Sequence, residues 1–504
     1  MSLRRIVKTT GALMSFQGIN LLIQLLLPPI FLRHYGIEAY GEWLTLAATV
    51  GYLSSLNFGL TWYSNNQVAI FYNRGELEEA NTIQATSLVL LLGIITAISL
   101  ITALVFVLPV NQWLGLKTPQ FVVSCTIYFL GLQVLARMLF GYFGGTFLAL
   151  GAAHRGTNWT TTQALINTLG TVALAFGHAP FSLIAAQQML TLVFFCGLVM
   201  VDLYRKGPEI FPRLRYADPK RFAEILKPSG YFGMLFAANF LVYQLPVMLM
   251  QRMLGPTSVV VFSLTRTIFS MSRQALSAVT QAMGPEITEL YGKRDWPRLV
   301  RLYELSERVV FALVPAVSIG TLIATPLLMT FWIHKRSLYD PYVCIVMAVI
   351  SGTMGIKEHK YTFQTSSNEH SDLARVTFYS YLIMVVLSIP AIHFFGILGF
   401  LSLWFITEVV QVLVILRVNE RLFANVAKLD HSPVYKLFLF MGAATALGWW
   451  FAIQDVHRSL LQVASIAIIF VVVLLAISFP LFGLKEVRTY LRDRQRTASE
   501  ILPN

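Results

Sequence analysis

Long apolar runs recur along almost the whole chain of 504 residues. Each run holds about 20 mostly apolar residues, the length a helix needs to cross the roughly 30 Å hydrocarbon core of a bilayer. Hydrophobic residues make up 56% of the chain and charged residues only 12%, which indicates a polytopic membrane protein. The predicted fold class is all-α, with about fourteen transmembrane helices. The predicted spans are 10–33, 41–60, 83–108, 120–142, 156–177, 181–201, 226–252, 256–283, 303–333, 339–361, 373–395, 396–418, 432–453 and 459–483.

The positively charged residues gather in alternate connections between these runs. The formal net charge is +13, and its lysines and arginines concentrate in 202–225, 284–302 and the tail 484–504. Cytoplasmic loops of membrane proteins carry such an excess, so we predict that both termini and these segments lie in the cytoplasm. This distribution explains the positive charge without a nucleic-acid partner.

An internal repeat relates the two halves of the chain. Residues in the first span and its exit match residues at a constant offset of 219, and the same offset relates FYNRGELEEA to LYGKRDWPRL. The matched pairs include Asn20 with Asn239, Arg33 with Arg252, and Gly36 with Gly255. Because six is an even number, two copies of six spans have the same orientation in the membrane. The predicted domains are an N-terminal six-helix lobe at 1–205, a cytoplasmic linker at 206–225, a C-terminal six-helix lobe at 226–420, two additional helices within 432–483 and a basic cytoplasmic tail at 484–504.

The predicted span 256–283 carries two arginines inside an apolar segment. At about 1.5 Å of rise per residue, Arg266 lies roughly 15 Å from its start, near the middle of the hydrocarbon core. An arginine there costs about 2.5–3.5 kcal/mol on the mildest scale, so it should face protein or water. The polar residues recur every three or four positions and share one helical face: Ser263, Arg266, Ser270, Arg273, Ser277 and Gln281. We predict a cationic stripe that lines a cavity for an anion, with Arg266, Ser270, Arg273 and Ser277 as substrate-binding residues.

Polar side chains also occur in three other spans. Gln17, Asn20 and Gln24 share a face in the first span, and Asn239 occupies the equivalent region of the seventh. Such amides line a cavity or form hydrogen bonds between helices, and both interpretations stay open. Arg137, near the inner end of the fourth span, either lines the cavity or extends to the membrane surface.

One carboxylate, Glu408, lies near the middle of a predicted span. Intramembrane carboxylates carry protons or pair with cations, so Glu408 is the candidate for ion coupling. The alternatives are a protonated glutamic acid hydrogen-bonded to a neighbouring helix and a structural partner of Arg266. The charged run from Lys357 to Lys360 is interpreted as a solvated loop between the tenth and eleventh spans.

The sequence shows none of the motifs of soluble enzyme chemistry. It holds no glycine-rich phosphate loop, no His/Glu zinc pair and no nucleophile elbow, and its nine histidines lack ligand spacing. We expect no metal site, no cofactor and no enzymatic activity.

The organisation and several segments of the chain resemble the multidrug/oligosaccharidyl-lipid/polysaccharide exporter superfamily. YGIEAYGEWLTLAATVGYLSSLNFGL with FYNRGELEEA is similar to the first two spans and first inner loop of O-antigen and exopolysaccharide flippases. LTRTIFSMSRQ and MGPEITELYGKRDWPRL are similar to the corresponding second-lobe segments. The resemblance covers roughly residues 1–420 and implies two six-helix lobes in a V around a central cavity.

The resemblance also implies an activity. It is the translocation of a polyprenyl-pyrophosphate-linked oligosaccharide across the bacterial inner membrane, by alternating access, for surface polysaccharide biosynthesis. The implied partners are this lipid-linked oligosaccharide, membrane lipids, and the polymerase and chain-length machinery of the same pathway. One alternative is a multidrug exporter of the same superfamily, whose sodium-coupled members carry an acidic residue in the first span, where this chain has none. The other is a membrane polymerase or glycosyltransferase, which usually displays carboxylates on longer outer loops than those predicted here.

Overall fold

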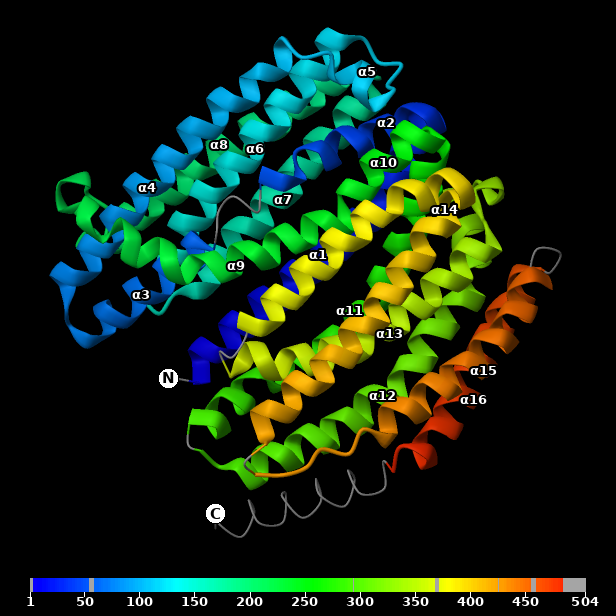
Figure 1. The fold of residues 1–504 in the computed structure, drawn as a ribbon. Coiled ribbons are helices and arrows are strands. Elements are labelled where there is room, and N and C mark those ends of the chain that lie inside the picture. The colour runs from blue at the N-terminus through cyan, green and yellow to red at the C-terminus, as the bar shows by residue number, and fades with distance from the viewer. Residues whose placement is uncertain are drawn as a thin grey trace. The chain divides into compact units, whose positions relative to one another are not determined.

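The computed structural model describes residues 3–53, 59–292, 294–367, 371–424, 426–454 and 459–483, and throughout these residues its regular structure is helical, without a strand (Figure 1). Ten of the described helices are long and apolar enough to cross a membrane. The predicted class, an all-α polytopic membrane protein, is confirmed. The tail 484–504 lies outside the described residues.

The chain forms two compact units, Met1–Val260 and Val261–Asn504. The first unit extends past the lobe boundary predicted near residue 205 because α9 packs against α3 and α4, and α10 packs against α2. The helices of the first unit are α1 (Leu3–His34), α2 (Gly36–Thr49), α3 (Leu60–Arg74), α4 (Leu77–Ala103), α5 (Val110–Leu114), α6 (Gln120–Thr146), α7 (Ala153–Phe176), α8 (Phe181–Lys206), α9 (Phe222–Tyr243) and α10 (Leu245–Leu254).

The predicted span 41–60 is wrong as a single helix. α2 ends at Thr49 and α3 begins only at Leu60, after Gly59 with φ 67°. Glycine adopts this left-handed conformation without the steric cost that a side chain would meet, so the chain changes direction there. The break makes the second element of the first unit two short helices, and it places the start of α3 beside α6.

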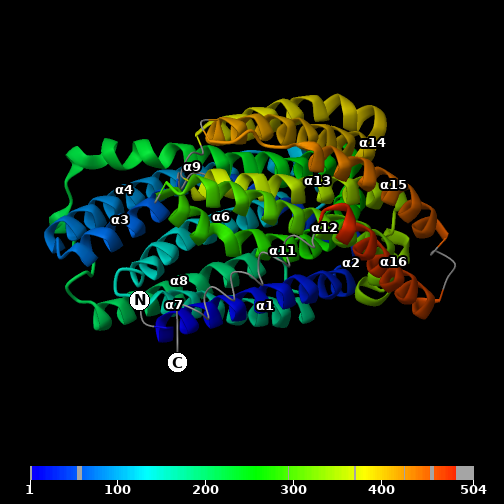
Figure 2. The same cartoon turned by 90° about the horizontal axis from the view of Figure 1, so that it is seen from below.

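The second unit is built around α13. Its helices are most of α11 (Pro256–Gly292), then α12 (Trp296–Leu328), α13 (Pro341–Ser366), α14 (Ser371–Phe423), α15 (Ser432–Gln454) and α16 (Leu460–Leu481). α13 packs against α12, α14 and α15, while α12 packs against both α15 and α16, the two helices that follow the predicted repeat (Figure 2). α14 contains both predicted spans 373–395 and 396–418, which meet at Gly396, where φ is 59° and ψ is −143°.

The backbone repeats the offset of 219 that the sequence shows. Positive φ angles occur at positions related by this offset, each just after a helical segment. The pairs are Gly36 (82°) with Gly255 (84°), Gly75 (83°) with Arg294 (55°), and Gly115 (64°) with His334 (56°). Positive φ is uncommon for residues other than glycine, so three such coincidences in one register are strong support for a duplicated fold.

The segment between α8 and α9 is attached to the first unit. The backbone N–H of Asp218 donates to Oγ1 of Thr86 at 2.9 Å, and the hydroxyl of Tyr72 donates to Oε1 of Glu209 at 2.9 Å. Arg221 forms an ion pair with Glu79, and the hydrogen bond from its guanidinium raises the pKa of Arg221. These bonds hold the predicted linker 206–225 against α3 and α4.

Candidate functional site

The predicted cationic stripe lies on α11, in the part that belongs to the second unit. Pro256 begins the helix, a position where the missing N–H of proline costs nothing. The apolar neighbours Phe262, Leu264, Ile268, Phe269 and Leu276 are buried. Arg266, Ser270, Arg273 and Ser277 are all partly exposed, as are several of their neighbours on the helix. Ser263 is buried, and the side chain of Gln281 lies outside the described part of the structure.

Side-chain contacts orient this stripe. The guanidinium of Arg266 lies over the ring of Phe262, 5.1 Å from its centroid. The ring of Phe262 meets Phe400 edge-on, with centroids 5.6 Å apart, and lies 6.4 Å from that of Trp404. A cation above an aromatic face is stabilised by about 0.5–2 kcal/mol, and the ring also fixes where the charge points. α14 therefore positions Arg266 through Phe262.

The C-terminal part of the stripe, Arg273 and Ser277, contacts α13. Arg273 directs one N–H at the thioether of Met354, and the hydroxyl of Ser277 donates to the carboxylate of Glu358. The side chain of Ser270 bonds within its own helix, to the carbonyl of Thr267 at 2.9 Å. The stripe thus combines two guanidinium groups with hydroxyls and one neighbouring carboxylate.

Glu408, the predicted coupling residue, forms a buried ion pair with Lys357 of α13. Its carboxylate also accepts hydrogen bonds from Tyr381 and from Nε1 of Trp404, the latter at 2.9 Å. Nζ of Lys357 donates in addition to Tyr381 at 2.8 Å and to Gln411 at 2.9 Å. Buried charges are tolerated when they are paired and hydrogen-bonded, and this pair meets both conditions.

A second buried ion pair joins α13 to α12. Lys360 pairs with Glu307 and donates to the hydroxyl of Tyr303 at 2.6 Å. Next to it, Nε2 of His359 lies 2.8 Å from Oγ of Ser306. Lys360 and His359 are fully buried, and Glu307 nearly so.

The interpretation of residues 357–360 as a solvated loop is wrong. α13 continues to Ser366, and Lys357, His359 and Lys360 lie inside the second unit. Successive residues of a helix point about 100° apart, so this short run reaches three neighbours. Lys357 contacts α14, Glu358 contacts α11, and His359 and Lys360 contact α12. A signal was present in the sequence: two lysines three positions apart and two carboxylates, Glu307 and Glu408, within apolar segments.

The other predicted site residues lie in the first unit. Gln17, Asn20 and Gln24 are on α1, Asn239 is on α9 and Arg137 is on α6. Gln17, Asn239 and Arg137 are exposed, and Asn20 and Gln24 are partly exposed. None of these five side chains hydrogen-bonds to another described residue, and their role in binding stays a prediction.

The predicted set is therefore divided between the units. Five of its members lie in the first unit, and the second contains Arg266, Ser270, Arg273, Ser277 and Glu408. Within the second unit, α13 contacts both groups. Its Met354 and Glu358 contact the stripe, and its Lys357 pairs with Glu408. Lys357, Lys360 and Glu307 were missed by sequence reasoning.

The fold of the chain is similar to that of several solved membrane proteins. The chain matches an inward-closed structure of the lipid II flippase MurJ with a TM-score of 0.65 at 10% identity, over 96% of this chain and 100% of MurJ. It matches an inward-facing multidrug resistance MATE family transporter of the MOP superfamily with a TM-score of 0.62 at 15% identity, over 84% of this chain and 100% of that chain. An outward-facing MATE transporter of the same superfamily gives 0.64 at 16% identity, over 84% and 96%. No protein-family model and no curated protein sequence matches the chain.

Proposed function

We propose that this protein translocates a polyprenyl-pyrophosphate-linked oligosaccharide across the bacterial inner membrane for surface polysaccharide biosynthesis, as a secondary transporter working by alternating access. Arg266 and Arg273 of α11 bind the diphosphate, and Ser270 and Ser277 bind oxygens around it. The lipid tail stays in the bilayer while the head group follows a polar path. Both termini are cytoplasmic in this proposal, and the polymerase and chain-length machinery act on the product outside.

The observation that carries the proposal is the pair of partly exposed guanidinium groups on one face of α11, which has no other charged residue before Glu286. Each costs at least about 2.5 kcal/mol inside a membrane, and an anionic ligand offsets that cost. A guanidinium fork matches the oxygens of a phosphate with two parallel hydrogen bonds. The similarity of the fold to that of MurJ, a lipid II flippase, supports a lipid-linked substrate.

A multidrug exporter is the second candidate, because the MATE transporters share the fold equally well. That function favours acidic or aromatic groups for cationic drugs. α1 contains no acidic residue, and the carboxylate of Glu408 is occupied by Lys357. The charge of the α11 stripe therefore favours an anionic head group over a cationic drug.

The test is transport by purified protein in liposomes that contain a fluorescent polyprenyl-pyrophosphate-linked sugar. Arg266→Ala and Arg273→Ala should each reduce transport at least about tenfold, with protein level and melting temperature unchanged, because each removes a charge-assisted contact of about 1.5–3 kcal/mol. Arg266→Lys should recover part of the activity, because it restores the charge but not the fork.

Arg33→Ala is the matched control, since Arg33 is an exposed arginine at the end of α1. It should transport normally. Full transport by the Arg266→Ala, Arg273→Ala double variant, or rhodamine efflux in place of lipid translocation by the unmodified protein, would overturn the proposal.

A further inference from the structure

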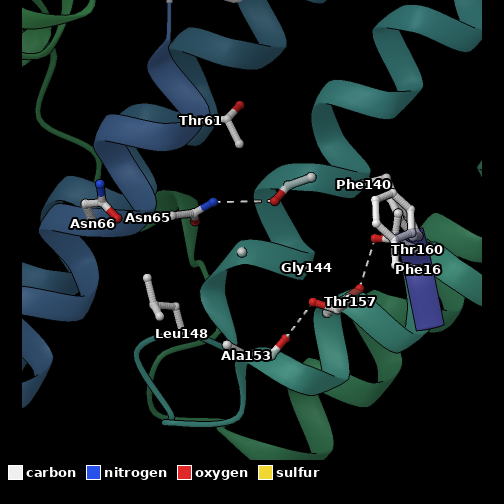
Figure 3. Close-up of a pocket in the computed structure, with 13 residues that line it drawn as sticks. Phe16, Thr61, Asn65, Asn66, Phe140, Gly144, Leu148, Ala153, Thr157 and Thr160 are labelled. Atoms are coloured by element: carbon white, nitrogen blue, oxygen red, sulfur yellow. Dashed lines mark hydrogen bonds between the residues drawn. The ribbon is translucent and has the colours of Figure 1, made fainter. Parts of the chain in front are cut away.

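A cavity of about 390 Å³ lies in the first unit, between α1, α3, α6 and α7 (Figure 3). It is bounded by the last turns of α6, the first turns of α7 and the start of α3, with Phe16 of α1 and Phe140 of α6 along its wall. These helix ends are the ones predicted to face the cytoplasm. Cavities of 300–1,000 Å³ are the usual size of small-molecule sites.

The described lining of this cavity is mostly apolar, with a few polar side chains and no charged one. Its polar side chains are those of Thr61, Asn65, Asn66, Thr157 and Thr160. The lack of a carboxylate disfavours a cationic ligand, and the lack of a lysine or arginine disfavours a phosphate. The lining chemistry therefore fits a neutral molecule that has both apolar faces and hydroxyl groups.

Hydrogen-bonding capacity remains open on this wall. Asn65 is buried and uses one N–H, which donates to the carbonyl of Gly141 at 3.4 Å. Its other N–H and its side-chain carbonyl have no partner among the described residues. The hydroxyls of Thr157 and Thr160 donate to carbonyls of their own helix, at 3.4 and 2.9 Å, and keep their oxygen lone pairs as acceptors (Figure 3).

Two glycines of α6, Gly141 and Gly144, leave space in the cavity, whereas the neighbouring Gly145 is required by packing. At Gly145 an added Cβ would lie 1.9 Å from Nδ2 of Asn65, so packing requires glycine there. At Gly141 and Gly144 the nearest atoms would lie 3.9 and 4.0 Å from an added Cβ, which is ordinary contact. Glycine inside a helix costs about 1 kcal/mol relative to alanine. At these two positions the absent side chain leaves space in the cavity and relieves no clash.

We propose that this cavity binds a sugar ring of the translocated head group. The inference rests on the proposed function and adds a saccharide subsite to it. Asn65 and the threonine oxygens bind sugar hydroxyls, while the rings of Phe16 and Phe140 provide apolar faces for the C–H groups of the ring.

The experiment measures binding of four defined lipids to the full-length protein in nanodiscs. They are undecaprenyl pyrophosphate and its glucose, galactose and N-acetylglucosamine derivatives. At least one of the sugar-bearing lipids should bind with a Kd about tenfold lower than that of the bare diphosphate lipid, which corresponds to about 1.4 kcal/mol of binding free energy. Gly144→Leu, which fills the cavity, and Asn65→Leu, which keeps the size of the side chain without its amide, should abolish this difference and leave bare-lipid affinity unchanged.

The controls separate this subsite from the proposed diphosphate site. Gly93→Leu on α4, at an exposed glycine with no atom within 4 Å of an added Cβ, should behave as the unmodified protein. Arg266→Ala should weaken all four lipids alike. If that variant has no effect while the sugar preference persists, the diphosphate site is wrong and the subsite stands. No preference for any of the three sugars, equal weakening of all four lipids by Gly144→Leu, or loss of rhodamine 6G binding in that variant would overturn the subsite.

Discussion

Lys357 of α13 and Glu408 of α14 form an ion pair in the buried interior of the second unit. Tyr381, Trp404 and Gln411 complete its hydrogen bonds. Glu408 therefore has a cationic partner within its own unit, and ion coupling by this carboxylate requires that the pair open during transport.

The first prediction concerns this pair. Glu408→Gln and Lys357→Met should each destabilise the protein by about 3–5 kcal/mol, because each leaves one buried charge alone. The double variant should recover much of that loss, since it leaves no unpaired charge. Thermal unfolding of the four proteins in one detergent measures the coupling.

Transport by the double variant then decides the role of Glu408. A stable double variant that transports normally, with the pH dependence of the unmodified protein, would show that the pair is structural. Loss of transport in a stable double variant would support coupling.

The second prediction concerns a carboxylate of the first unit. Glu42 is buried on α2 and accepts hydrogen bonds from the backbone N–H groups of Lys117 and Thr118, at 2.6 and 3.0 Å, and from the hydroxyl of Thr118. Glu42→Gln should destabilise the protein by about 1–3 kcal/mol, because the amide group presents one acceptor oxygen where the carboxylate presents two.

Glu38→Gln is the matched control for this change. Glu38 pairs with the side chain of Lys117, but both are largely exposed, at 62% and 73%. Such a pair contributes about 0–1 kcal/mol. An equal loss of melting temperature in the two variants would contradict the assigned role of Glu42.

The third prediction concerns orientation. In a background without Cys125, Cys196 and Cys344, single cysteines at Lys220 and Arg298 should resist impermeant thiol reagents in intact cells. A cysteine at Lys117 should react, because the opposite side of the membrane is predicted for that loop. Labelling of the first two from outside would reverse the predicted topology.

The fourth prediction concerns Gly255, which joins α10 to α11 with φ 84° and ψ 177°. Almost only glycine adopts this conformation, so Gly255→Ala should destabilise the protein by about 1–3 kcal/mol although the added methyl meets no atom. Gly197→Ala inside α8 also meets no atom and should be neutral or stabilising. Equal melting temperatures of the two variants would show that Gly255 carries no backbone requirement.

Most of the membrane spans could be predicted from the sequence because length and hydrophobicity determine them. The predicted spans 156–177 and 256–283 form α7 and α11, which are not among the ten described helices that are long and apolar enough to cross a membrane. The boundary between the eleventh and twelfth spans, placed at residue 396, coincides with the kink at Gly396. The break between α2 and α3 was missed because an apolar run does not record a change of backbone direction. The Lys360–Glu307 pair was missed for a different reason: the charges that cancel lie 53 positions apart, and only packing brings them together.

The candidate stripe was predictable because Arg266 and Arg273 repeat with the period of a single helix. The cavity beside Gly144 was not, because four helices from separate parts of the chain contribute to it. Its open space comes from side chains that are absent, and a sequence gives no sign of where such absences meet.

The shared offset of positive φ angles has an evolutionary consequence. Gly75 and Gly115 of the first copy correspond to Arg294 and His334 of the second, so residue identity diverged while backbone direction persisted. The left-handed backbone at Arg294 and His334 thus persists at residues that tolerate it less well than glycine does.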